Sequence, residues 1–126
     1  MLVPPEVPVG QSKPFRRTAI VVEDDAIQRD MIALLLEESG YRVIQCEDAE
    51  TASLALKARH PSILIADIGL VGKMDGLQLA HLARMMHPKL RVVVISGRPP
   101  AGELPEGVTF FSKPVYPVAL LREATN

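Results

Sequence analysis

Three acidic side chains stand where they could share one site. Glu23 and Asp24 directly follow a short apolar run, and Asp67 directly follows another. Carboxylates that meet at about 4 Å repel one another by roughly 4 kcal/mol per pair at an effective dielectric of about 20, so such a cluster needs a cation to stay ionised. Mg²⁺ suits the cluster, because it takes octahedral oxygen ligation and needs only one or two carboxylates beside waters and phosphate oxygens. The pattern therefore predicts a magnesium site.

A hydroxyl and an ammonium group follow two further apolar runs. Ser96 ends the run at 91–95, and Lys113 comes soon after the run at 108–111. With Mg²⁺ beside it, Asp67 could act as a nucleophile towards a phosphoryl donor, since aspartyl phosphates are an established covalent intermediate. Lys113 and Ser96 would then contact the oxygens of the transferred group and offset its charge of about −1.5 to −2. Together with the acids, these groups predict a phosphoryl acceptor site.

The elements that must position these groups alternate along the chain. Apolar runs of strand length lie at residues 19–22, 41–45, 63–66, 91–95 and 108–111. Helical patterns lie at 26–39 and 49–60, before His87-Pro88, and after Pro117. Continuous apolar strands separated by helices indicate a parallel sheet covered on both faces, and such a sheet binds ligands beyond the carboxyl ends of its strands. An α/β fold would therefore gather the acids, Ser96 and Lys113 at one edge.

The first helical pattern has well-marked ends. Asp25 stands where a helix N-cap belongs, and Gly40 stands where a left-handed C-terminal cap belongs. The i, i+4, i+7 and i+8 positions of one helix face are occupied by Ile27, Met31, Leu34 and Leu35. This spacing predicts that these four side chains face the core.

A helix is not expected between the fourth and fifth strands. Residues 97–107 read GRPPAGELPEG and hold six Gly or Pro among eleven residues. Proline inside a helix costs ~3 kcal/mol and glycine ~1 kcal/mol, so the segment should cross over as a loop and leave four helices in total. The last two strands would then expose apolar surface unless this crossover, residues 1–17 or a second copy of the chain covers it, and a homodimer is one of these three solutions.

The bulk composition fits one domain of ordinary size. The chain has 126 residues, of which 48% are hydrophobic and 23% charged, with a formal net charge of −1. Residues 1–17 contain four prolines and no periodicity, so we interpret them as an extended arm before a domain at 18–126. The charge argues against nucleic acid or an anionic membrane surface as a partner, and no apolar run reaches the ~18 residues of a membrane span. A cytoplasmic location is expected.

Five fragments of the sequence resemble the receiver domain of bacterial two-component response regulators. They are AIVVEDD at 19–25, ILIADIGL at 63–70, MDG at 74–76, VVVISG at 92–97 and FFSKP at 110–114. Each fragment is weak alone, but five in this order and spacing form a specific signal that spans about residues 18–125. The resemblance implies a flavodoxin-like, doubly wound sheet of five parallel strands in the order 2-1-3-4-5.

The resemblance also implies roles for the acidic residues. Glu23 and Asp24 match the acidic pair that binds Mg²⁺ in this family, and Asp67 matches the phosphorylated aspartate, which is itself a metal ligand. Gly69 would add a backbone carbonyl to the metal site. The protein would thus be a signalling phosphoacceptor that assists only its own phosphorylation and dephosphorylation, and not an enzyme with a separate substrate.

Further roles fall on the last two strands. Ser96 matches the hydroxyl that closes on the phosphoryl group, and Lys113 matches the family's lysine. Phe110 matches the aromatic residue that changes rotamer together with that hydroxyl. The peptide bond between Lys113 and Pro114 would be cis. The implied phosphodonor is a histidine kinase or a histidine phosphotransfer protein, and phosphorylation would change the surface around the fourth and fifth strands.

The sequence departs from the family pattern in two places. The stretch from Asp67 to Asp75 is one residue longer than the commonest pattern, and Val71 stands where a proline is often found.

A pseudo-receiver, which keeps the fold as a binding or dimerisation surface without phosphotransfer, is the main alternative, and the intact acids and Lys113 argue against it. A phosphohydrolase with an aspartyl nucleophile would need a second acid two residues after Asp67, where Gly69 stands.

Overall fold

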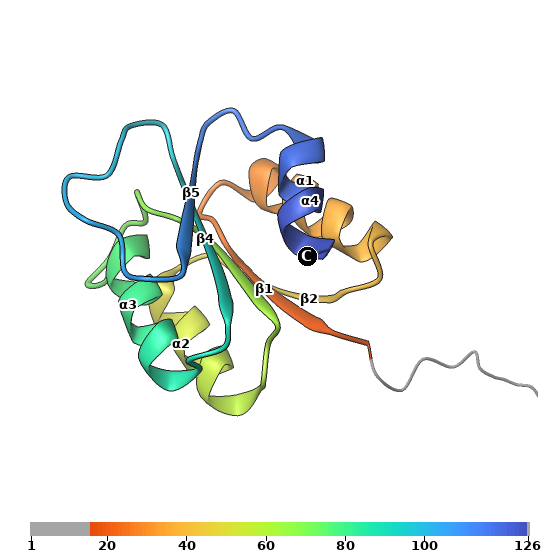
Figure 1. Ribbon diagram of the computed structural model, residues 1–126, viewed down its shortest axis with the longest axis horizontal. Coiled ribbons are helices and arrows are strands. Elements are labelled where there is room, and N and C mark those ends of the chain that lie inside the picture. The colour runs from red at the N-terminus through yellow and green to blue at the C-terminus, as the bar shows by residue number, and fades with distance from the viewer. Residues whose placement is uncertain (1–15, 126) are drawn as a thin grey trace, which may run out of the picture.

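Five parallel strands form one sheet in the order β2-β1-β3-β4-β5 in this computed structural model, which describes residues 16–125. The strands are β1 (Thr18–Val22), β2 (Arg42–Cys46), β3 (Ile63–Asp67), β4 (Arg91–Ser96) and β5 (Val108–Ser112). The helices are α1 (Ala26–Glu38), α2 (Ala49–Ala58), α3 (Gly76–Met86) and α4 (Pro117–Thr125). α1 and α4 cover one face of the sheet, and α2 and α3 cover the other (Figure 1). The predicted fold class, strand order and number of helices are confirmed over the described residues.

Arg17, which directly precedes β1, is hydrogen-bonded to the sheet. Its carbonyl oxygen accepts a hydrogen bond from the Arg42 amide at 2.8 Å, directly before β1 begins. Most of the predicted arm, residues 1–15, lies outside the described residues, so the domain boundaries stay a prediction. Among residues 16–125, no helix combines the length and the apolar character that crossing a membrane requires.

The register of the sheet brings the strand ends to one edge. Val22 at the end of β1 pairs with Ala66 of β3, and Asp67 pairs with Ile95 of β4. Because all five strands run in the same direction, the residues that follow them emerge side by side. Glu23 and Asp67 are therefore neighbours although they lie far apart in the sequence.

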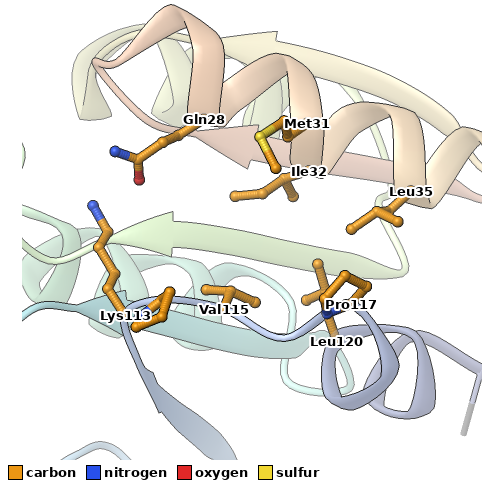
Figure 2. Close-up of a pocket in the computed structure, with 9 residues that line it drawn as sticks. Gln28, Met31, Ile32, Leu35, Lys113, Val115, Pro117 and Leu120 are labelled. Carbon is orange, nitrogen blue, oxygen red and sulfur yellow. The ribbon is translucent and has the colours of Figure 1, made fainter.

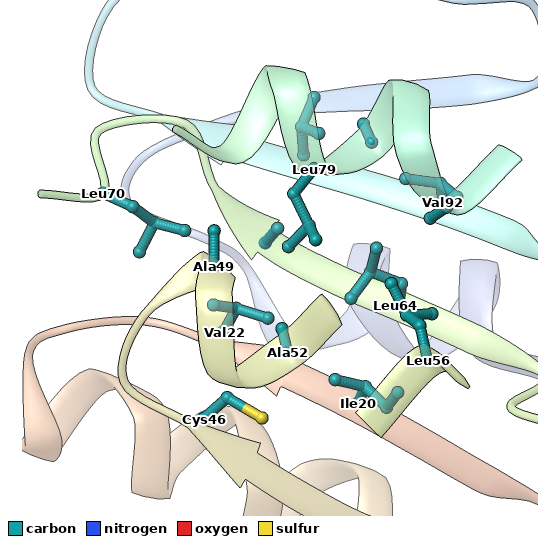
Figure 3. Close-up of a cluster of buried hydrophobic side chains, with 14 of the residues drawn as sticks. Ile20, Val22, Cys46, Ala49, Ala52, Leu56, Leu64, Leu70, Leu79 and Val92 are labelled. Carbon is teal, nitrogen blue, oxygen red and sulfur yellow. The ribbon is translucent and has the colours of Figure 1, made fainter. Parts of the chain in front are cut away.

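Two apolar clusters fill the space between the sheet and its helices. The cluster under α2 and α3 joins Ile20, Leu64 and Val92 of the sheet to Leu56 and Leu79 of the helices, all of them fully buried (Figure 3). The second cluster lies on the opposite face, under α1 and α4. Because the central strands are covered on both faces, they carry continuous apolar runs without alternation.

The predicted inward face of α1 is wrong for three of its four residues. Ile27, Met31 and Leu34 are 74%, 60% and 56% exposed. The buried side chains of the helix are Ile32, Ala33 and Leu36. Apolar residues occupy most of the circumference of α1 in its second half, so the spacing is compatible with two inward faces. The sheet packs against the face that carries Ile32 and Leu36. The caps at Asp25 and Gly40 are as predicted.

The crossover from β4 to β5 runs as a loop. Residues 97–107, all of which the structure describes, contain no helix, as predicted. Leu104 of this crossover packs against the cluster under α2 and α3, as do Val108 and Phe110 of β5. The crossover therefore covers part of the apolar surface that the absent helix would have covered, and the homodimer stays a prediction.

Candidate functional site

Backbone hydrogen bonds to β4 continue past the ends of β3 and β5. The Ile68 amide donates to the Ile95 carbonyl at 2.8 Å, and the Lys113 amide donates to the Ser96 carbonyl at 2.9 Å. These bonds fix the first residue after each strand relative to its neighbour. Asp67, Ser96 and Lys113 are thereby held at one edge of the sheet.

Glu23, Asp24 and Asp67 form one acidic cluster at this edge. Each residue offers one carboxylate oxygen, and these oxygens all lie within 4.8 Å of one another. Glu23 and Asp67 are buried, whereas Asp24 is exposed. Hard oxygen donors in this number and spacing fit a small divalent cation such as Mg²⁺, and the exposed side of Asp24 leaves room for its waters.

The ammonium group of Lys113 bridges two of the three acids. Its Nζ donates to Asp67 Oδ2 at 2.9 Å and to Glu23 Oε1 at 3.3 Å. Burial by itself would lower the pKa of Lys113, but the hydrogen bonds and charges of Asp67 and Glu23 outweigh it and raise that pKa above its ordinary value. Lys113 therefore stays charged at neutral pH. The peptide bond that follows it is cis, as the resemblance implied.

Glu23 shows the electrostatic effect of crowding acids in a buried place. Burial raises its pKa from 4.5 to about 7, and the charge of Asp67 adds to the rise, while the Asp25 amide and Lys113 oppose it. That amide donates to Glu23 Oε2 at 3.1 Å. A carboxylate whose pKa is raised, mainly by burial and further by a neighbouring negative charge, is one that an added cation would stabilise in its ionised form. The donor set and its electrostatics therefore both fit a divalent cation.

Both carboxylate oxygens of Asp67 have partners. Oδ2 pairs with Lys113, and Oδ1 accepts the Gly69 amide at 2.9 Å. The loop after Asp67 returns to the same place, because a β-carbon on Gly76 would lie 2.0 Å from the Asp67 carbonyl oxygen. Glycine is thus required where α3 begins. The structure places Gly69 beside the cluster, and the use of its carbonyl as a metal ligand stays a prediction.

Ser96 and Phe110 lie on the neighbouring strands and have other contacts. The Ser96 Oγ accepts the Arg98 amide at 3.1 Å, so this hydroxyl closes a turn at the start of the crossover. Phe110 is half-buried against the core and pairs with Val94. The roles predicted for these two residues on phosphorylation stay predictions.

Sequence patterns did not reveal two side chains that hold this edge together. Arg29 of α1 donates to the Glu23 carbonyl at 2.7 Å and to Gln45 Oε1 at 3.3 Å. Glu50 of α2 accepts the amide of Lys73, in the loop after β3, at 3.0 Å. Charged residues near the start of a helix are ordinarily solvated, so their types and spacing gave no signal of these contacts.

An apolar groove runs from the site between α1 and the chain that follows β5 (Figure 2). It measures about 410 Å³. Lys113 and Gln28 lie at one end of the groove (Figure 2). Met31 and Ile32 lie across from Val115, and Leu35 lies across from Pro117 further along it. Part of the α1 surface that was expected in the core therefore lines this groove.

Comparisons with known proteins agree on one family. Residues 19–123 match the family described as response regulator receiver domain. The response regulator receiver protein CpdR of Brucella abortus (strain 2308) is 30% identical over 112 residues, which cover 85% of this chain and 89% of CpdR. The nitrogen assimilation regulatory protein NtrX of Azorhizobium caulinodans is 35% identical over 79 residues. That match covers 62% of this chain but spans only 17% of NtrX.

The fold also matches solved structures. A response regulator receiver protein from Sinorhizobium medicae WSM419 superposes with a TM-score of 0.80 over 87% of this chain and 92% of its own, at 23% identity. At this identity the likeness concerns the arrangement of strands and helices.

Proposed function

Because the chain belongs to the family of response regulator receiver domains, we propose that it is a signalling switch whose phosphoacceptor is Asp67. The observation that carries the proposal is the 2.9 Å contact between Lys113 Nζ and Asp67 Oδ2 inside an acidic cluster. A lysine, a reactive carboxylate and a set of cation ligands meet there, and phosphoryl transfer to aspartate uses all three.

In the proposed transfer, a carboxylate oxygen of Asp67 attacks the phosphorus of a phosphohistidine. A P–O bond forms as the P–N bond breaks, and the electron pair of the broken bond leaves with the imidazole nitrogen. Water later attacks the phosphorus of the aspartyl phosphate, which releases inorganic phosphate and restores the carboxylate. The donor would be a histidine kinase or a histidine phosphotransfer protein, since receiver domains take their phosphoryl group from such partners.

Lys113 and Ser96 would form new hydrogen bonds to the phosphoryl group during the transfer. Lys113 starts from its bond to Asp67 and would extend it to an oxygen of the arriving group, which offsets the charge there. Ser96 would give up its bond with the Arg98 amide and donate its hydroxyl proton to another phosphoryl oxygen. Both movements pull on the ends of β4 and β5, so the surface around Phe110 would change with phosphorylation.

Glu23, Asp24 and Asp67 would hold a Mg²⁺ ion, with the Gly69 carbonyl as a further protein ligand. When bound, the ion supplies positive charge that stabilises the oxygens of the transferring group. The support for this site is the spacing of the three carboxylate oxygens, within 4.8 Å, and the raised pKa of Glu23, which results mainly from burial and in part from the charge of Asp67.

The test of the acceptor is the intact mass of the protein after incubation with acetyl phosphate. We expect wild type to gain one phosphoryl group when Mg²⁺ is present and none without it, and Asp67→Asn to gain none. Asp30→Asn is the matched control, because it removes an exposed carboxylate from α1. It should be phosphorylated like wild type. Equal phosphorylation of Asp67→Asn would exclude Asp67 as the acceptor.

A pseudo-receiver would keep the fold without the chemistry. It would show no Mg²⁺-dependent binding of a phosphate analogue such as beryllium fluoride, whereas a phosphoacceptor binds the analogue at Asp67. Sedimentation with and without the analogue also tests the proposed homodimer. A monomer at high concentration in both states would exclude it.

A further inference from the structure

The loop between β3 and α3 begins and ends at the phosphoacceptor. Residues 68–75 leave the sheet after Asp67 and return where Gly76 packs against the Asp67 backbone. The first part of the loop is tied down, because the Gly69 amide bonds Asp67 Oδ1 and Leu70 is buried in the core (Figure 3). A shift within the loop would therefore reach the acidic cluster.

The middle of this loop is held by a side chain from another helix. Val71, Gly72 and Lys73 are exposed. This stretch is hydrogen-bonded to α2 through the Lys73 amide, which donates to Glu50 Oε2 at 3.0 Å. Glu50 stands in the first turn of α2, which is itself fixed by its N-cap.

Gly72 allows the loop to approach the Glu50 carboxylate. Its φ of +126° lies in the region that favours glycine, and a β-carbon there would lie 3.2 Å from Glu50 Oε1. One oxygen of the carboxylate thus accepts the Lys73 amide while the other lies against the glycine. This fitted contact falls in the stretch from Asp67 to Asp75 that is longer than the common family pattern.

We propose that Glu50 is a positioning residue for phosphoryl transfer: its carboxylate clamps the β3–α3 loop to α2 and so fixes the Gly69 backbone beside the acidic cluster. This inference rests on the proposed function of Asp67. Without the clamp, the exposed middle of the loop loses its tie to α2, and the Gly69 backbone takes up a wider range of orientations. Mg²⁺ demands near-octahedral geometry, so its binding should weaken. No atom of Glu50 takes part in the transfer, so saturating Mg²⁺ should restore the rate.

The test compares Glu50→Ala with Glu50→Gln, which keeps an acceptor oxygen for the Lys73 amide. Glu47→Ala is the control, because it removes an exposed charge just before the same helix. In the metal-free protein, Glu50→Ala should speed hydrogen exchange of the Lys73 amide by on the order of tenfold. It should raise the Mg²⁺ concentration for half-maximal phosphorylation by acetyl phosphate roughly three- to tenfold, with a maximal rate near wild type. The other two variants should stay within about twofold of wild type on both measures.

The inference is overturned if Glu50→Ala leaves the half-saturating Mg²⁺ concentration unchanged, or if Glu50→Gln behaves like Glu50→Ala. If Glu50→Ala does not fold, Gly72→Ala disturbs the same contact from the loop side and should produce the same two changes. If wild type gains no phosphoryl group, the proposed function fails while the clamp does not. Exchange of the Lys73 amide and calorimetric titration with Mg²⁺ then decide on the clamp alone.

Discussion

Two of the loops at the carboxyl edge of the sheet, the β3–α3 loop and the β4–β5 crossover, are built in opposite ways. The β3–α3 loop, residues 68–75, is tied at its start by Gly69, in the core by Leu70, in its middle by Glu50 and at its end by the close approach of Gly76. The β4–β5 crossover is longer and mostly exposed. Its contact with the core is made by Leu104, and its first turn is closed by Ser96.

This difference distinguishes the β3–α3 loop, which holds the geometry of the acceptor, from the crossover, which can change conformation. A switch must keep its acceptor geometry constant while another surface changes. The tied loop carries the backbone next to Asp67, and the loosely tied crossover follows Ser96, which is the residue proposed to move. A helix in the crossover would add internal hydrogen bonds that resist such a change. Its absence therefore places the lower local stability on the side that is proposed to respond to phosphorylation.

The largest difference should come from adding one methyl group where the β3–α3 loop meets α3 and one methyl group in the crossover. Gly76→Ala would place a β-carbon 2.0 Å from the Asp67 carbonyl oxygen, and backbone cannot give way as a flexible side chain would. We expect the free energy of unfolding to fall by about 3 kcal/mol. Gly102→Ala in the crossover meets nothing within 4 Å and should change it by less than about 0.5 kcal/mol. Urea unfolding measures both, and equal losses would contradict the contrast.

The acid cluster beside the tied loop should also give the metal-free protein a pH dependence. The pKa of Glu23 is raised by burial from 4.5 to about 7, so the folded protein holds a proton that the unfolded chain has released. The resulting stabilisation is complete below pH 4.5 and is lost as the pH rises through about 7, because the unfolded state binds fewer protons in that window. A shift of this size corresponds to roughly 3 kcal/mol.

Denaturant midpoints at about pH 5 and about pH 7.5 without Mg²⁺ measure this effect. The fall in stability between them should be smaller in Glu23→Gln than in wild type. Glu103→Gln, on the exposed crossover, should keep the wild-type fall. Mg²⁺ should stabilise wild type more at the higher pH, since the ionised carboxylate binds the cation. Parallel curves for wild type and Glu23→Gln would rule out the buried proton.

The convergence of the site could be predicted because it depends on strand ends. A residue that directly follows a strand in a parallel sheet lies at the carboxyl edge, so Glu23, Asp67 and Lys113 become neighbours once the strands are recognised. The missing helix followed from the cost of Gly and Pro in residues 97–107. The cost of Gly and Pro acts locally, whereas the convergence also needed the order of the strands, which the resemblance implied.

The inward face of α1 and the tie made by Glu50 could not be predicted in this way. Apolar residues cover so much of α1 that only packing against the sheet decides whether Ile32 or Met31 turns inward. The contact of Glu50 joins residues 23 positions apart and depends on the positive φ of Gly72, which the sequence does not specify. Both features are set by tertiary structure, and so they escape spacing rules.

Removing one apolar anchor from the crossover should have the smallest effect of the three comparisons. Leu104 is half-buried, so Leu104→Ala should cost about 1 kcal/mol, below the range for a fully buried leucine. Val71→Ala removes a side chain that is 74% exposed from the tied loop and should cost less than about 0.5 kcal/mol. Leu104→Ala should also speed amide exchange at Phe110, which packs against the same apolar cluster, and leave the Lys73 amide unchanged. A change at Lys73 would mean that the two loops are coupled, so that loosening the responding side also loosens the side that holds the acceptor.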